Sequence, residues 1–443
     1  MNEDIFIKRK AYAKFLEWKD KKNHKPLMVV GARQVGKSFI VRKFGENEYK
    51  NFIEINLFNR KDIVELYKSI DTSENKYKTL SLLLGVDLED SNVLLFIDEI
   101  QESEELISEL KFFNEKHPKV RIICAGSLLG VKLKRSHFSF PVGKVEIYHM
   151  YPLDFKEFMQ AFNEDLLIEE IRKSFNSDTK INIALHTKSL NYYRYYLCIG
   201  GMPDSVKNFI EVNMDITKYD REVLTSILEA YIADMSKYVS NKSETTKIQR
   251  AFNSVPSQLA GKGDKFKYTA IAKGSRKRDY EEPVDWLIAS NLLFQSNKVS
   301  TPRLPLKGYE IPGYYKLFLS DTGILTKMLD VNFGDILIDN LDDYKGIITE
   351  NFVAANLLAF GRNLNYYKAD RQEFEVDFLL YTKEDGVIPV EVKSSGHTKS
   401  VSLNNYIEKY TPKYSIRLST KNFGFSNGIK SIPLYAIFCV CDL

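Results

Sequence analysis

Residues 31–38 constrain the fold of this chain more than any other stretch. They read Gly-Ala-Arg-Gln-Val-Gly-Lys-Ser and match the pattern G-x-x-x-x-G-K-[ST] without departure. The apolar run 27–30 precedes them, and the segment 39–44 has the apolar spacing of a helix. A strand, a glycine-bearing loop and a helix in this order predict a loop whose backbone N–H groups face phosphate oxygens.

The same pattern assigns roles to individual side chains. Lys37 is expected to reach the β- and γ-phosphates of a nucleotide, and the hydroxyl of Ser38 to bind a magnesium ion. The two glycines let the backbone curl, and the positive end of the following helix attracts the phosphates. The predicted nucleotide-binding residues are Gly31, Gln34, Val35, Gly36, Lys37, Ser38 and Phe39.

A second apolar run, 94–97, ends in Asp98 and Glu99. Buried parallel strands have this composition, and ligands bind at their carboxyl ends. We expect Asp98 to hold the magnesium ion, directly or through water, and Glu99 to orient and polarise the attacking water. In the sequence between the loop and this run there is room for one more strand, 52–55.

A third strand-like run, 120–125, is followed by Gly126 and Ser127. A small polar side chain at the tip of this strand would lie beside the γ-phosphate. Ser127 is therefore predicted to sense the γ-phosphate, and a turn serine without a role is the alternative. Residues 25–160 alternate strands and helices, which predicts an α/β fold with a parallel sheet.

Length and composition indicate a folded protein of several domains. The chain has 443 residues, of which 44% are hydrophobic and 28% charged, and its net charge of +4 is too small to identify a partner. We expect an ATPase domain at 1–160, a helical lid at 161–240, a winged-helix-like domain at 241–335 and an α/β domain at 336–443. Residues 165–240 have mainly helical periodicity.

The sequence shows no membrane span and no secretory signal, so we expect a cytoplasmic protein. Its four cysteines form no C-x-x-C pair and are predicted to be buried free thiols. Cys439 and Cys441 are expected to share one face of a strand.

Residues 262–278 carry seven Lys or Arg side chains against one acidic residue, Asp264. A helix is expected from Tyr280 and a strand with a turn from Leu292. Short helices followed by a hairpin are typical of a winged helix-turn-helix, whose basic turn would suit a DNA backbone. The alternative is a solvated basic loop, because phosphate contacts require charges clustered on one face.

The C-terminal residues indicate a second possible site. The strand 373–381 is predicted to return through a turn as the strand 387–393, which would bring Asp377 beside Glu391. Two carboxylates there would bind magnesium and clamp a scissile phosphate, Lys393 would position the water, and Glu350 from the preceding helix would add a ligand. This is the D…E-x-K arrangement of restriction-type nucleases. The alternative is a set of charged residues on the wet face of a hairpin.

Five segments in this order, GARQVGKS, LLFIDEIQ, YPLDFKEF, GGMP and EVDFLL…IPVEVKSS, resemble a group of prokaryotic AAA-like ATPases. In that group a winged-helix region and a C-terminal domain related to PD-(D/E)xK nucleases follow the ATPase. The resemblance implies ATP and Mg²⁺ as cofactors, bound through Lys37, Ser38, Asp98 and Glu99, with Ser127 as a γ-phosphate sensor. It also implies that Glu350, Asp377, Glu391 and Lys393 occupy the nuclease-like positions.

The chain departs from this group at Lys144, where members often carry an arginine that can act as an arginine finger. Arg135 lies nearby in sequence and is a candidate substitute. We expect a Mg-dependent ATPase that couples nucleotide state to DNA binding or processing. The alternatives are an ATP-gated, metal-dependent DNA endonuclease and a slow-turnover nucleotide switch that binds protein partners. The sequence leaves the oligomeric state open.

Overall fold

The computed structural model describes residues 6–443 except 128–130, 132–140, 238–241, 262, 264, 341–343, 370–373 and 395–400. The chain divides into two compact units. The smaller unit comprises residues 8–151 with 289–291, and the larger comprises residues 1–7, 152–288 and 292–443. The division into four domains predicted from the sequence stays a prediction.

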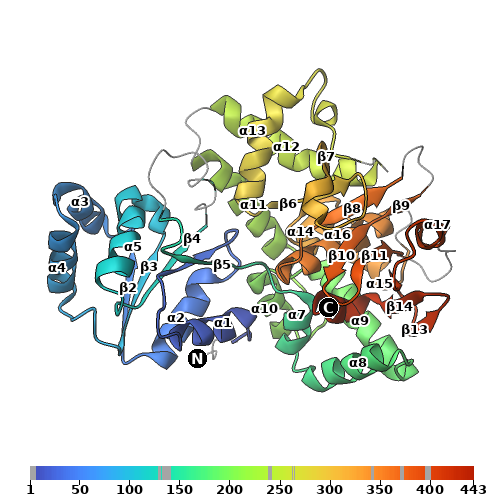
Figure 1. Cartoon of the computed structure of the whole chain (residues 1–443), viewed down its shortest axis with the longest axis horizontal. Helices are drawn as coiled ribbons and strands as arrows, with labels where there is room; N and C mark the ends of the chain where they lie inside the picture. Colours follow the sequence, from blue (N-terminus) through green and yellow to red (C-terminus); the bar gives the residue numbers. More distant parts are fainter. Residues whose placement is uncertain are drawn as a thin grey trace. The chain divides into compact units, whose positions relative to one another are not determined.

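A five-stranded parallel sheet organises the smaller unit, with the order β2-β3-β4-β1-β5 (Figure 1). This finding confirms the predicted α/β fold with a parallel sheet. Its strands are β1 (Leu27–Val30), β2 (Asn51–Asn56), β3 (Val93–Asp98), β4 (Ile122–Gly126) and β5 (Glu146–His149). Its helices are α1 (Lys10–Lys19), α2 (Lys37–Glu48), α3 (Lys61–Ser69), α4 (Ser73–Leu84), the 3-10 turn η1 (Ile100–Glu102) and α5 (Glu104–Lys116).

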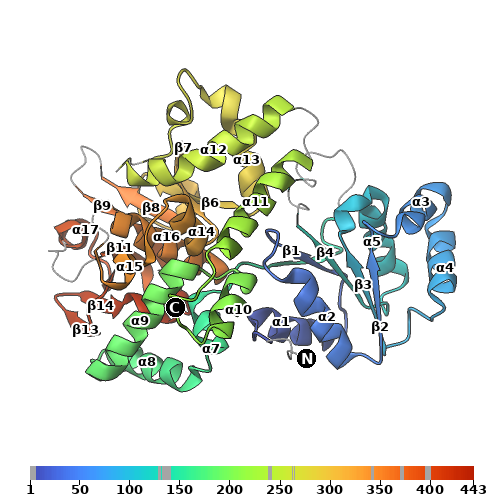
Figure 2. The ribbon, with the colours of Figure 1, turned by 180° about the vertical axis from the view of Figure 1, so that it is seen from behind.

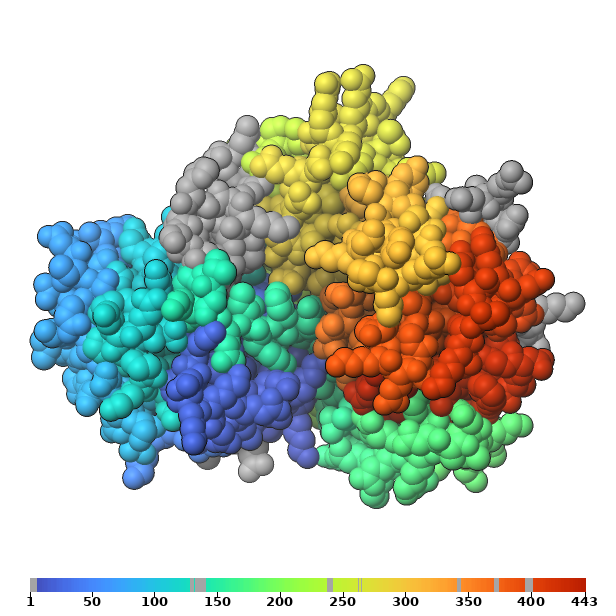
Figure 3. Space-filling model, in the orientation of Figure 1, coloured from blue at the N-terminus to red at the C-terminus, as the bar shows by residue number. Residues whose placement is uncertain are grey.

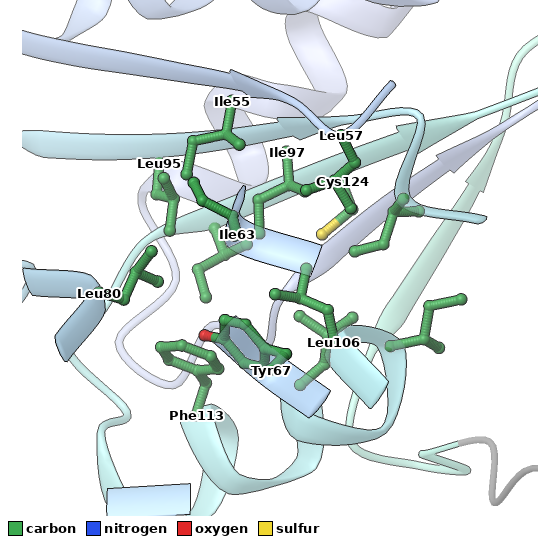
Figure 4. Close-up of a cluster of buried hydrophobic side chains, with 14 of the residues drawn as sticks. Ile55, Leu57, Ile63, Tyr67, Leu80, Leu95, Ile97, Leu106, Phe113 and Cys124 are labelled. Carbon is green, nitrogen blue, oxygen red and sulfur yellow. The ribbon is translucent and has the colours of Figure 1, made fainter. Parts of the chain in front are cut away.

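One face of this sheet packs on α3, α4 and α5 through a cluster of buried apolar side chains (Figure 4). Alternate residues of the strands point to this face, among them Ile55, Leu95 and Cys124. Tyr67 of α3 and Phe113 of α5 cover them. The residues of β1, β3 and β4 are all buried, because helices cover both faces of a parallel sheet.

The opposite face is covered by α1 and α2. Phe44 of α2 packs edge-on against Phe15 of α1, with ring centroids 5.4 Å apart, and Phe15 also contacts Tyr148 of β5. Because the glycine-bearing loop enters α2 directly, this packing fixes the direction in which the first turn of α2 points.

The strand order places three chain segments at one edge of the sheet. The additional strand β2 precedes β3 in the sequence, as expected, but it pairs with the outer side of β3. In space β4 separates β1 from β3, so its carboxyl end lies between the glycine-bearing loop and Asp98. The tips of β1, β4 and β3 therefore form one continuous edge.

In the larger unit, residues 165–237 are largely helical, which confirms the predicted periodicity. Figures 1 and 2 show α9 and α14 side by side in this unit. The helices before the hairpin are α7 (Phe155–Ala161), α8 (Asp165–Ser177), α9 (Ile183–Ile199), α10 (Pro203–Glu211), α11 (Glu222–Lys237), α12 (Lys242–Ala260) and α13 (Lys277–Ala289). Those that follow it are α14 (Thr322–Met328), α15 (Phe333–Leu337), α16 (Tyr344–Ala359), α17 (Val401–Tyr410) and α18 (Ile437–Cys441).

The GGMP segment ends α9 and contacts a second segment of the resemblance, YPLDFKEF. The N–H of Leu153 donates to the carbonyl of Gly201 at 2.7 Å, and a Cβ on Gly201 would lie 2.0 Å from the carbonyl oxygen of Leu153. The N–H of Gly201 donates to Oδ2 of Asp321 at 2.7 Å, and Oδ1 of Asp321 caps α14. Glycine is therefore required here because the backbones approach each other closely.

Two sheets in the larger unit join regions that the sequence separates. The hairpin of β6 (Leu293–Val299) and β7 (Glu310–Leu319) belongs to a sheet of order β7-β6-β8-β9, whose other strands are β8 (Asn365–Lys368) and β9 (Glu375–Val376). The second sheet has the order β10-β11-β12-β14-β13. Its strands are β10 (Phe378–Thr382), β11 (Gly386–Val392), β12 (Ser415–Ser419), β13 (Gly424–Ser426) and β14 (Ile429–Pro433). Helices α12 and α13 precede the hairpin directly, but β6 also pairs with β8, beyond residue 335, so the winged helix stays a prediction.

The C-terminal residues pack on the helical part of the larger unit. In Figure 3 the green surface of α8 adjoins the red surface of the last residues, and Arg172 forms an ion pair of 2.5 Å with Asp442. All four cysteines are free and buried, as predicted. The strand predicted at Cys439 and Cys441 is wrong: both belong to α18, an apolar segment too short to show a helical period. Among the residues that the structure describes, no helix combines the length and the hydropathy needed to span a membrane.

Candidate functional site

The loop between β1 and α2 has the backbone conformation that its glycines predict. Gly36 has a φ of 89° and Gln34 a φ of 64°, both in the left-handed region. A Cβ on Gly31 would lie 2.1 Å from the carbonyl oxygen of Met150, because the chain leaving β5 passes directly over the loop. Val35 is fully buried and anchors the loop, whereas Phe39 is partly exposed.

The side chains of Lys37 and Arg9 both donate hydrogen bonds to backbone carbonyls of this loop. The ammonium group of Lys37 donates to the carbonyls of Gly31 at 3.0 Å and Ala32 at 2.7 Å, and only 8% of this residue is exposed. The guanidinium group of Arg9 donates to the carbonyls of Val35 at 2.9 Å and Tyr151 at 2.6 Å. The loop is therefore held in its curled form by side chains of the same unit.

Ser38 and Asp98 meet at the edge of the sheet. The hydroxyl of Ser38 donates to Oδ1 of Asp98 at 3.0 Å, although the two residues are 60 positions apart. Asn56, at the tip of β2, donates to Oδ2 of Asp98 at 3.3 Å. Burial raises the pKa of Asp98, and the hydrogen bonds from Ser38 and from the N–H of Glu99 act in the opposite direction.

Arg42 lies on α2 about one helical turn after Ser38. It donates two hydrogen bonds of 2.7 Å to the carboxylate of Glu54 on β2, and its guanidinium nitrogen lies 3.9 Å from Oδ2 of Asp98. The bidentate pair fixes the planar guanidinium group, so it contributes a positive charge beside Asp98 at a defined place.

Glu99 lies directly after β3 in an unusual backbone conformation. Its φ is 54°, which turns the chain sharply into η1. The side-chain amide of Gln101 donates a hydrogen bond to Oε2 of Glu99. Gln101 is itself buried, so this contact restricts the directions in which the Glu99 carboxylate can point.

Three further residues of the smaller unit were singled out from the sequence: Ser127, Lys144 and Arg135. Ser127 follows the tip of β4 and is half-buried at the edge shared with Asp98. Lys144 forms an ion pair of 2.9 Å with Glu115 at the end of α5, and both side chains are about 40% exposed. Arg135 lies outside the described residues.

The residues at this edge fit a magnesium ion bound with a nucleotide. The Ser38 hydroxyl and the Asp98 carboxylate are hard oxygen ligands that converge on one point, and Mg²⁺ completes such a shell with phosphate oxygens and water. The curled loop and the N-terminus of α2 supply the backbone donors that phosphate groups require.

A cavity of about 380 Å³ in the larger unit contains the predicted nuclease-like residues. Glu350 comes from α16, Asp377 from the residue between β9 and β10, and Glu391 and Lys393 from the end of β11. The register of the hairpin pairs Phe378 with Val390, which brings Asp377 to the level of Glu391. The backbone N–H of Val392 donates to Oδ2 of Asp377 at 2.7 Å.

Two lysines pair with the carboxylates of this cavity. The ammonium group of Lys316, on β7, lies 2.9 Å from Oε1 of Glu350 and 2.8 Å from Oε1 of Glu375. Lys393 pairs with Oε1 of Glu391 at 2.9 Å. Burial, with the charge of Glu350 adding to it, raises the pKa of Asp377. Across the described part of the chain, no three His, Cys, Asp or Glu side chains are gathered closely enough to hold a metal ion.

Part of the basic segment 262–278 can be placed. Lys267, Lys273 and Arg276 are exposed, while Lys277 pairs with Glu281 at 3.1 Å. Lys265 lies 3.7 Å from the ring centroid of Tyr314 and lines the cavity. Lys262 and Asp264 lie outside the described residues.

Several side chains at the two sites were missed by the sequence analysis: Arg9, Arg42, Asn56, Gln101 and Lys316. Asn56 and Gln101 had a readable signal, since Asn56 directly follows the predicted strand 52–55 and Gln101 follows Glu99 by two positions. The other three carry no signal, because their positions depend on which elements become neighbours in space.

Three sequence families match successive parts of the chain. Residues 23–159 match an AAA domain, residues 190–334 match a domain of unknown function, DUF8612, and residues 345–437 match another, DUF4143. The first match and the geometry above agree that this part of the chain is an AAA-type P-loop ATPase domain. A search of curated proteins found no match.

Solved structures with a related arrangement are only distantly similar. The Walker-type ATPase Paby2304 of Pyrococcus abyssi is 15% identical, with a TM-score of 0.46, over 74% of this chain and 96% of that one. The RuvB Holliday junction branch migration motor of Thermotoga maritima is 14% identical, with a TM-score of 0.27, over 74% and 96%. The ORC1 protein of Aeropyrum pernix, in complex with DNA, is 12% identical, with a TM-score of 0.28, over 76% and 95%.

Proposed function

We propose that this chain binds ATP with Mg²⁺, hydrolyses it, and couples its nucleotide state to the binding or processing of DNA. The observation that carries the proposal is the hydrogen bond of 3.0 Å between Ser38 and Asp98. It joins the first turn of α2 to the tip of β3, which are the two places where a P-loop ATPase holds its metal ion.

Each residue of the site has a distinct task in this proposal. The loop amides and Lys37 bind the phosphates, and Ser38 and Asp98 hold the magnesium ion, which neutralises phosphate charge when it is bound. Glu99 accepts hydrogen bonds from the attacking water and orients it toward the γ-phosphate. Ser127, which directly follows β4, contacts the γ-phosphate in this proposal.

DNA is the proposed partner because of the basic segment. Lys267, Lys273 and Arg276 are exposed, and the structure gives them no ion pair with the described residues, so they are available to phosphate groups. Contacts of this type strengthen association at low salt and weaken steeply as salt rises.

The test is ATP turnover with and without DNA, measured on the wild type and on Lys37→Ala and Glu99→Gln. We expect DNA to stimulate the wild type, Lys37→Ala to lose nucleotide binding, and Glu99→Gln to bind ATP without turning it over. Low turnover that does not respond to DNA would instead support the slow nucleotide switch that binds protein partners.

The cavity of the larger unit favours a second candidate function, an ATP-gated, metal-dependent DNA endonuclease. The cavity gathers Glu350, Asp377, Glu391 and Lys393 from three separate segments of the chain. Magnesium-dependent nicking of supercoiled DNA tests this function. Asp377→Ala and Lys393→Ala should abolish nicking while ATP binding stays intact, and no nicking by the wild type under any nucleotide condition would exclude it.

A further inference from the structure

The cavity that contains Asp377 and Glu391 is lined by residues from two regions of the chain, each of which matches a different sequence family. Its carboxylates come from residues 345–437, which match one domain of unknown function, whereas Lys316 comes from residues 190–334, which match the other. Strand β7 brings Lys316 into the cavity beside α16 and β9. The cavity is therefore complete only when both regions are present.

The ammonium group of Lys316 lies between two carboxylates of the cavity and compensates their negative charge. Its ammonium group lies within 3 Å of carboxylate oxygens of both Glu350 and Glu375. The Lys316 side chain is only 12% exposed. Lys316 is thus an amine that the two carboxylates hold at a largely buried position in the cavity wall.

Glu391 supplies an independent sign that the cavity accepts a further cation. Only 1% of Glu391 is exposed, and its Oε2 has no hydrogen-bond partner among the described residues. A buried carboxylate oxygen without a partner is costly, and a divalent cation is a ligand that would satisfy it. Asp377 lies at the same level of the hairpin and can share that cation.

We propose that Lys316 is an internal cation that competes with divalent metal ions for this cavity. While its ammonium group stays on Glu350 and Glu375, it neutralises part of the negative charge and weakens metal binding at Asp377 and Glu391. When the amine is removed or displaced, a divalent ion binds at Asp377 and Glu391. The proposal rests on the second candidate function only for the location of the metal, and it requires no cleavage activity.

The experiment is calorimetric titration of Mn²⁺ into the full-length chain without nucleotide. Lys316→Met removes the amine and keeps a long apolar side chain, and we expect it to bind Mn²⁺ roughly tenfold more tightly than the wild type or better. Lys298→Met is the matched control, because Lys298 lies on the neighbouring strand β6 and pairs with none of these acids, and it should behave as the wild type. Equal or weaker binding by Lys316→Met would overturn the proposal.

Two double variants show where the additional Mn²⁺ affinity of Lys316→Met arises. Adding Asp377→Asn to Lys316→Met should abolish it, whereas adding Asp98→Asn should leave it intact, because Asp98 belongs to the nucleotide site. Retention of the gain in the Asp377→Asn double variant would place the metal elsewhere and contradict the inference. ATP turnover of Lys316→Met should equal that of the wild type, so failure of the ATPase proposal would be seen separately with Lys37→Ala.

Loss of Lys316 leaves buried acids without a counter-ion, so stability provides a second readout. Lys316→Met should melt at a lower temperature in chelator, and Mn²⁺ should raise its Tm more than that of the wild type. A residue with only a structural role would show the loss without the rescue. If the variant does not fold, Lys316→Met with Glu350→Gln is compared with Glu350→Gln alone: tighter Mn²⁺ binding by the double variant supports the inference, and no difference refutes it.

Discussion

At the scale of single residues, the orientation of Glu99 depends on its neighbour Gln101. The amide of Gln101 donates to the carboxylate, and the left-handed conformation of Glu99 directs the chain so that the two side chains meet. A carboxylate that positions a water molecule works only within a narrow range of directions. Gln101 is therefore a positioning residue for the proposed hydrolysis.

Gln101→Ala tests this role. We expect kcat for ATP hydrolysis to fall by roughly tenfold, because a misdirected base loses part of its contribution, while nucleotide affinity stays unchanged. Steady-state kinetics together with equilibrium binding of a non-hydrolysable ATP analogue separates the two effects. A parallel loss of affinity and rate would show that Gln101 only supports the fold.

Asp321 is a second residue whose surroundings alter its chemistry. It is buried and accepts hydrogen bonds from Gly201 and Ile324, and burial raises its pKa to about 6. Between the ordinary pKa of aspartate and this value, the unfolded chain releases the proton first. The free energy of unfolding therefore decreases as pH rises through this window.

The variant Asp321→Asn tests this prediction, because it replaces the titratable carboxyl group with a neutral amide. The free energy of unfolding of the wild type, relative to this variant, should fall by roughly 3 kcal/mol between about pH 4 and pH 7, since the shift is about two pKa units. Urea denaturation at the two pH values measures the difference. Asp204→Asn, at an exposed position of α10, is the control, and parallel pH curves for Asp321→Asn and the wild type would contradict the account.

At the scale of elements, the junction of β1 with the loop depends on the absence of a side chain at Gly31. The carbonyl oxygen of Met150 comes within 2.1 Å of the place where a Cβ would be, and Met150 N donates to the carbonyl of Val30 at 2.7 Å. A methyl group there must push β5 away from β1 or distort the loop.

Gly31→Ala should therefore lower both stability and nucleotide affinity. We expect a loss of about 1–3 kcal/mol in the free energy of unfolding, as is typical of overpacking. Thermal melts with and without MgATP measure both effects. Gly346→Ala offers a matched control, because a Cβ at Gly346 meets nothing within 4 Å. Equal behaviour of the two variants would show that the close approach is unimportant.

Sequence patterns predict which strands and helices form better than they predict which of these elements lie side by side in space. The runs that end at Asp98 and begin at Leu27 become adjacent parts of one sheet edge because parallel strands must present their carboxyl ends together. Arg42 and Asn56 approach Asp98 only because β2 pairs with the outer side of β3, which no local pattern encodes. Lys316 likewise reaches Glu350 through the pairing of distant segments. The segment with Cys439 and Cys441 forms the short helix α18 and not the predicted strand, and five apolar residues have no period that distinguishes the two.

At the scale of the whole molecule, pairing and ionic contacts of the larger unit cross residue 335, where the sequence predicts a domain boundary. Strand β8 pairs with β6, and Lys316 compensates Glu350 and Glu375 across that position. The region 336–443 alone would expose one edge of β8 and leave buried acids without a counter-ion. Both effects disfavour independent folding.

We accordingly predict different behaviour for two fragments. Residues 152–443 should give far-UV circular dichroism typical of a folded protein and a cooperative thermal transition, whereas residues 336–443 should aggregate or show no transition. The comparison uses the same buffer and concentration for both. A cooperative transition of the 336–443 fragment would contradict the shared construction of the cavity.

The central claim is that the loop at residues 31–38 and the carboxylate of Asp98 together bind a nucleoside triphosphate with its metal ion. The most direct test is calorimetric titration of a non-hydrolysable ATP analogue into the full chain, with and without Mg²⁺. The wild type should bind more tightly with Mg²⁺, Asp98→Asn should lose that gain, and Lys144→Ala should behave as the wild type. No binding by the wild type, or unchanged Mg²⁺-dependent binding by Asp98→Asn, would contradict the account.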